Sequence, residues 1–112
     1  MDNKVRKYLY DILETVNETL EEAAARSRRY DVFVKDRVFR KFVQMNIGII
    51  GEATGKILKL QPDISITSAR SIVNARNLII HSYDSLDPEI MWGIVINHLP
   101  VLKHEVESLL EK

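Results

Sequence analysis

The chain contains no cysteine, which excludes a disulfide framework, a thiolate nucleophile and a cysteine-based zinc site. Its first residues, Met1-Asp2-Asn3-Lys4, form no apolar signal region. No apolar run approaches the roughly 18 residues that are needed to span a bilayer. We therefore expect a soluble, cytoplasmic protein without a membrane partner, although the lack of cysteine alone leaves the redox compartment open.

The chain also lacks net charge, with 16 Lys and Arg against 16 Asp and Glu, so whole-molecule attraction to nucleic acid is excluded. The charges are unevenly distributed, however. Residues 1–25 carry three positive and six negative side chains. Residues 26–76 carry eleven positive and four negative side chains, and residues 77–112 carry two positive and six negative ones. A basic middle therefore lies between two acidic ends.

Two long helices are predicted in the first half of the chain. Apolar residues at three- and four-residue steps predict an amphipathic helix over residues 2 to about 28, with Asp2 as its N-cap. A second helix is predicted over residues 36–59, before Gln61-Pro62, because proline disfavours helical geometry in the residue before it. Between the two helices, Val32-Phe33-Val34 is predicted to be a short apolar link.

Local signals also divide the second half of the chain. A third helix is predicted to run from a cap at Thr67 or Ser65 to about Ser82. Asp87-Pro88-Glu89 is typical of a helix start, with Asp as N-cap and Pro at the first helical position.

The position of Pro100 decides how the last part of the chain is divided. It lies too deep for an unbroken helix, so a break or kink is predicted near residues 97–99, before a short last helix. No strand alternation or internal repeat is seen, and 112 residues with 46% hydrophobic composition suit one modest core. The sequence therefore predicts an all-α, up-down bundle of four to five helices in a single domain, residues 1–112.

The second predicted helix is apolar around most of its circumference between Phe42 and Leu58. Such a helix is buried on more than one side, and in so small a chain the second side could be another subunit. Gly48, Gly51 and Gly55 fall on one face, where they would let a neighbouring helix approach closely. These features lead us to expect a homodimer.

Two stripes of residues run along the third predicted helix. Arg76 lies in the middle of its apolar stripe, and five steps of 100° place His81 about 140° away from it. Either the helix loosens before Asp84, or the two side chains meet across two subunits. The polar stripe has i, i+4, i+7 and i+11 spacing and consists of Arg70, Asn74, Asn77 and His81.

Each of these residues also has a purely structural interpretation. Arg76 could form a buried ion pair with Glu52, the only acidic residue between Phe42 and Leu58. His81 could be a half-exposed polar residue favoured by the dipole at a helix end. Tyr83 could be a core aromatic with a satisfied hydroxyl group.

The remaining polar candidates are a basic cluster and two histidines. His98 and His104 lie six residues apart, on different faces of a helix, and no metal-ligand pattern surrounds them, so no metal site is expected. The basic cluster is either a solvated surface or an RNA-binding rim. Its members are Arg26, Arg28, Arg29, Arg37, Arg40 and Lys41.

The spacing of Arg76, His81 and Tyr83, Arg-x4-His-x-Tyr, resembles the signature of the HepT-like family of the HEPN superfamily, small all-helical ribonuclease toxins. The resemblance covers essentially the whole chain. It extends to Ile50-Gly51-Glu52-Ala53, to Trp92 after the Asp-Pro helix start, and to Leu99-Pro100-Val101-Leu102. It implies a dimeric, metal-independent endoribonuclease without a cofactor, whose two motifs face one another in a cleft.

The resemblance also implies a role for each motif residue. His81 would be the general base or acid at the ribose 2′-hydroxyl or the leaving oxygen. Arg76 would stabilise the charge on the phosphate, and Asn77 would orient His81 or the phosphate. The implied partner is a minimal nucleotidyltransferase antitoxin that adds AMP to Tyr83 and so blocks the cleft.

Two interpretations from other classes remain open. The chain could be a non-catalytic helical subunit that holds a nucleotide or a nucleotidyltransferase partner, with Arg76 and His81 serving dimer packing alone. It could also be a purely structural dimerisation module. The combined set of Arg76, Asn77, His81 and Tyr83 favours catalysis, because a bare bundle would need none of these residues.

Overall fold

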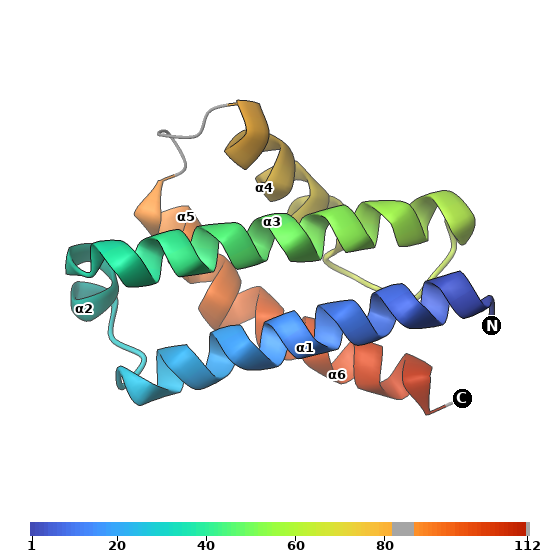
Figure 1. Cartoon of the computed structure of the whole chain (residues 1–112), viewed down its shortest axis with the longest axis horizontal. Helices are drawn as coiled ribbons and strands as arrows, with labels where there is room; N and C mark the ends of the chain where they lie inside the picture. The colour runs from blue at the N-terminus through green and yellow to red at the C-terminus, as the bar shows by residue number, and fades with distance from the viewer. Residues whose placement is uncertain (82–86, 112) are drawn as a thin grey trace.

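Two long antiparallel helices, α1 (Asn3–Ala25) and α3 (Arg37–Leu60), form the centre of the computed structural model (Figure 1). The structure describes residues 1–81 and 87–111, and for His81 the backbone alone. Helix α4 packs on α3, and the C-terminal helix α6 packs on the other side of α1. The predicted all-α bundle is confirmed. Within the described residues, no helix is long and apolar enough to cross a membrane.

Helix α1 begins at the predicted N-cap. The Asp2 carboxylate accepts hydrogen bonds from the backbone N–H groups of Lys4 at 2.6 Å and Val5 at 3.3 Å. The helix ends earlier than predicted because Ser27 and Arg28 adopt left-handed backbone conformations, with φ of 61° and 51°. Helical hydrogen bonding therefore stops at Ala25.

The segment predicted to be a link is a short helix, α2 (Tyr30–Lys35). Phe33 anchors it in the core, with its ring edge-to-face against Phe39 at 5.6 Å and stacked on Trp92 at 5.0 Å between centroids. Six residues are too few to show helical periodicity in the sequence. Aromatic packing therefore fixes this turn of helix, which the local pattern alone could not reveal.

The second half of the chain contains α4 (Ala69–His81), α5 (Pro88–Gly93), the π-helical segment η1 (Ile94–His98) and α6 (Leu99–Leu110). The helix start at residue 87 is confirmed, since the Asp87 carboxylate accepts from the Glu89 N–H at 2.8 Å. Near the predicted break or kink the chain stays helical, but it changes to π geometry in η1 directly before α6. Pro100 has no N–H, and its ring crowds the carbonyl group four residues earlier, at Ile96. The backbone therefore widens to π geometry in η1.

Helix α4 begins at Ala69, slightly later than predicted. The proposed cap Thr67 is engaged elsewhere, since its N–H and its hydroxyl both donate to the Glu105 carboxylate, at 3.1 and 3.2 Å. A long-range contact to α6 therefore replaces the predicted capping bond. It ties the segment before α4 to the C-terminal helix.

Candidate active site

Gly51 of α3 allows α4 to approach closely at Arg76. A Cβ atom at Gly51 would overlap the Arg76 Cβ and would lie 3.0 Å from both the Arg76 Cγ and the Ile72 carbonyl oxygen. At Gly55 a Cβ would meet Val73 at an ordinary 3.9 Å. The predicted close approach is thus confirmed at Gly51. At Gly48 a Cβ would meet nothing within 4 Å in the single chain.

Arg76 is half-buried, and the start of its aliphatic stem, Cβ and Cγ, lies against Gly51. The Arg76 Nη1 donates to the Asn77 Oδ1 at 3.2 Å, and Asn77 itself is exposed. No carboxylate within the described residues pairs with Arg76. A guanidinium held in this way keeps donors available for an anion such as a phosphate.

The predicted buried ion pair between Arg76 and Glu52 is wrong for the described chain. The Glu52 side chain is 55% exposed, and its carboxylate lies 3.6 Å from the Lys56 Nζ, one helical turn further on. One residue beyond Gly51, Glu52 points about 100° away from the face that meets α4. It lines a polar groove between α1 and α3 together with Tyr8 and Asp11.

Helix α4 stays α-helical through His81, so it does not loosen before that residue. The backbone positions of Arg76 and His81 therefore keep their separation of about 140° around the axis. Asn77 lies between them, one turn before His81, and its hydrogen bond draws the Arg76 guanidinium toward that side. The side chain of His81 and all of Tyr83 lie outside the described residues.

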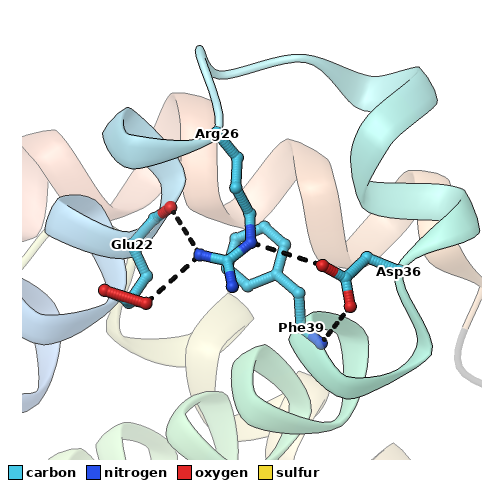
Figure 2. Close-up of polar contacts among 4 residues, drawn as sticks. All are labelled: Glu22, Arg26, Asp36 and Phe39. Atoms are coloured by element: carbon cyan, nitrogen blue, oxygen red, sulfur yellow. Dashed lines mark hydrogen bonds and ion pairs between the residues drawn. The ribbon is translucent and has the colours of Figure 1, made fainter.

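Arg26, predicted as part of an RNA-binding rim, is instead tied into the bundle (Figure 2). Its Nη1 donates to the Glu22 carbonyl and carboxylate at 3.0 and 3.2 Å, and its Nε lies 3.4 Å from the Asp36 carboxylate. The guanidinium also covers the Phe39 ring at 4.3 Å. These contacts join the end of α1 to the start of α3.

Asp36 links this arrangement to the N-terminus of α3. Its carboxylate accepts from the Phe39 N–H at 2.9 Å and so caps the helix. That hydrogen bond, with the Arg26 guanidinium adding to it, holds the pKa of Asp36 below its ordinary value. The sequence pattern did not predict this cluster, although Glu22, four residues before Arg26, was a local signal for part of it.

The other members of the basic cluster fall into two groups. Arg29 pairs with Asp31, its Nε lying 3.1 Å from the carboxylate, and Arg40 donates to the Val34 carbonyl. Three exposed members have no side-chain partner among the described residues, namely Arg28, Arg37 and Lys41. The RNA-binding rim remains a prediction, and these three are its available cations.

The described fold is that of a small all-helical bundle protein, with an arginine and an asparagine joined on one of its helices. The chain belongs to the HepT-like ribonuclease family, because residues 12–109 match the family described as Ribonuclease HepT-like. No group of three His, Cys, Asp or Glu side chains that could hold a metal ion occurs in the part that the structure describes.

Curated relatives match nearly the whole chain. The protein named "Putative RNase MJ1380" from Methanocaldococcus jannaschii is 33% identical over 104 residues, covering 92% of this chain and 94% of the relative. "Probable ribonuclease HepT" from Thermococcus cleftensis is 31% identical over 113 residues, covering 97% and 98%. No solved structure matches the chain.

Proposed function

We propose that this chain is a metal-independent endoribonuclease toxin that cuts RNA in a cleft between two copies of itself. The observation that carries the proposal is the half-buried Arg76, which lacks an acidic partner among the described residues and bonds to Asn77 on the helix that ends at His81. A structural arginine would be expected to have a carboxylate partner. A phosphate-binding arginine needs its donors free.

In the proposed reaction the ribose 2′-oxygen attacks the neighbouring phosphorus, and the bond to the 5′-oxygen of the next nucleotide breaks. His81 takes the 2′-hydroxyl proton or donates one to the leaving oxygen, since the ordinary pKa of histidine lies near neutrality. Arg76 stabilises the charge that builds on the phosphate oxygens, and Asn77 orients the phosphate or His81. The products are a 2′,3′-cyclic phosphate and a 5′-hydroxyl end.

Apolar side chains left exposed on α3 and α4 support the proposed dimer. Met45 is 59% exposed and Ile49 43%, and both lie on α3. On α4, Ile80 is 55% exposed and directly precedes His81. Covering such surfaces in a second copy would remove apolar area from water and place two motifs near one another.

Variants that each lack one motif residue test whether the site is shared between two chains. We mix His81→Ala protein with Arg76→Gln protein, allow subunits to exchange, and measure RNA cleavage. If Arg76 of one copy works with His81 of the other, the mixed dimer contains one intact site and activity returns. If both residues act within one chain, the mixture stays inactive. Light scattering that reports a monomer at micromolar concentration would contradict the dimer itself.

The family resemblance also supports control by a minimal nucleotidyltransferase antitoxin. In the proposed modification the Tyr83 phenol oxygen attacks the α-phosphorus of ATP, an O–P bond forms, and pyrophosphate leaves. The added phosphate and adenosine would occupy the space and charge that the RNA phosphate requires. Co-expression with a cognate nucleotidyltransferase should add one or more AMP masses to the peptide that contains Tyr83. An adduct confined to another residue, or a Tyr83→Phe variant that is still modified, would contradict it.

A further inference from the structure

A groove lies between α4 on one side and α5 with η1 on the other, and we call it the α4–η1 groove. Its volume is about 430 Å³, and its apolar walls include Ile72 and Leu78 from α4 and Ile90 and Ile94 from the opposite side. Leu78 and Ile90 are each about half exposed, at 49% and 51%. The groove is therefore an open slot with apolar sides.

Its polar groups are two asparagine amides, the Ser71 hydroxyl and the His98 imidazole. Asn74 and Asn97 line the groove, and neither side chain has a hydrogen-bond partner among the described residues. The described lining contains no Lys, Arg, Asp or Glu side chain. His98 is the titratable residue of this lining, and its Nδ1 atom lies 3.3 Å from the Ser68 hydroxyl. The groove thus suits an uncharged ligand with both apolar and polar parts.

A nucleobase has this chemistry, because its flat faces pack on apolar side chains while its edge carries hydrogen-bond donors and acceptors. An asparagine amide offers one donor group and one acceptor, which is the set that reads a base edge. We propose that the α4–η1 groove binds a nucleobase of a single-stranded RNA substrate beside the cleaved bond. This inference rests on the proposed ribonuclease function and adds a determinant of sequence preference to it.

The position of the groove along α4 connects it to the motif. Asn74 precedes Asn77 by one turn and His81 by two turns, which is about 10 Å along the helix axis at 1.5 Å per residue. All three belong to the polar stripe of α4. A strand whose phosphate lies at Asn77 and His81 would carry a neighbouring base to Asn74, so the base held in the groove would select the bond that is cut.

Gly93 provides a way to block the groove without overpacking the core. It lines the groove, and a Cβ atom there would meet nothing within 4 Å. Gly93→Leu should therefore fold and fill part of the slot, which a thermal melt checks. Asn74→Ala removes one amide from an exposed position, so it serves as a second variant if Gly93→Leu fails to fold. Asn3→Ala, at the exposed start of α1, is the matched control.

Binding is measured with fluorescently labelled tetradeoxynucleotides, which lack the 2′-hydroxyl that the proposed reaction requires. An abasic tetramer carries the same phosphates without bases, so it isolates the contribution of the base. We expect at least one base-bearing tetramer to bind about tenfold more tightly than the abasic one, and Gly93→Leu to remove that difference. Asn74→Ala should weaken base-dependent binding about fivefold, and Asn3→Ala should leave it unchanged.

Three results would overturn the proposal. The first is equal binding of abasic and base-bearing tetramers, and the second is unchanged base-dependent binding in folded Gly93→Leu and Asn74→Ala proteins. The third is conversion of a dimer to a monomer by Gly93→Leu. The last result would show that a second copy of the chain fills the groove. RNA cleavage measured in parallel separates the two proposals. A wild-type protein that cuts RNA without base-dependent binding contradicts the groove alone, whereas one that binds bases but cuts no RNA contradicts the ribonuclease function alone.

Discussion

Gly51→Ala should push α4 away from α3 and destabilise the fold. The new Cβ would overlap the Arg76 Cβ and would lie 3.0 Å from the Ile72 carbonyl oxygen. Neither atom is the end of a flexible side chain. The Arg76 Cβ is bonded directly to the α4 backbone, and the Ile72 carbonyl oxygen is part of that backbone. The two helices must therefore separate locally, and the clash cannot be relieved by a rotamer change.

The expected change in the free energy of unfolding of Gly51→Ala is the balance of two opposing effects. Overpacking a well-packed contact typically costs about 1–3 kcal/mol. Replacing glycine by alanine inside a helix returns about 1 kcal/mol. Because the clash involves backbone and a Cβ atom, we place the packing cost in the upper half of its range, which leaves a net loss of about 1–2 kcal/mol. Gly55→Ala meets Val73 only at an ordinary 3.9 Å, so it should gain up to about 1 kcal/mol.

Urea denaturation followed by far-UV circular dichroism, at one fixed protein concentration, measures both variants. We expect the unfolding midpoint to fall for Gly51→Ala and to stay level or rise for Gly55→Ala. Ribonuclease activity should fall with Gly51→Ala as well, because Arg76 moves with α4. Equal stability of the two variants would refute the reasoning, since it would show that Gly51 does not set the distance between α3 and α4.

Further predictions separate structural from RNA-binding arginines and concern acid stability. Arg26→Ala should lower the free energy of unfolding by about 1–2 kcal/mol through loss of its contacts with Phe39 and Asp36, as measured by urea denaturation. Arg37→Ala should leave stability unchanged but reduce the salt dependence of RNA binding by about 0.7 in a log–log plot, whereas an unchanged slope would remove Arg37 from the rim. The pKa of Asp36 is lower in the folded protein than its ordinary value of 3.8, so the Asp36 carboxylate stabilises the fold fully at pH values above 3.8. This contribution is lost as the pH falls through the lower pKa of the folded protein. Asp36→Asn should thus be less stable than the parent at pH 7, and the difference should shrink at pH 3.

Much of the helical framework could be predicted because its signals are local. Asp2 and Asp87 cap helices through hydrogen bonds to N–H groups two or three residues away. Pro100 disturbs only the turn before it, where η1 is found. Each feature depends on neighbours in sequence, so the pattern of residue types was sufficient to predict it.

The partners of the charged residues could not be predicted in the same way. Glu52 was expected to meet Arg76 but lies one residue past the face that contacts α4 and pairs with Lys56 instead. The Arg26 side chain joins the end of α1 to the start of α3 through the Phe39 ring and the Asp36 carboxylate, which are 13 and 10 residues away in the sequence. Which charged side chains pair across two helices depends on where the helices cross, and a periodic sequence pattern does not specify that crossing point.

RNA cleavage by the purified protein in EDTA, beside a His81→Ala control purified in the same way, tests the central claim most directly. The proposal predicts that the wild-type protein cuts single-stranded RNA and leaves 2′,3′-cyclic phosphate ends, whereas folded His81→Ala protein cuts none. Cleavage of the same RNA at the same rate by the His81→Ala protein would contradict the proposed site. The absence of cleavage by the wild-type protein across a broad set of RNAs would contradict the proposed activity.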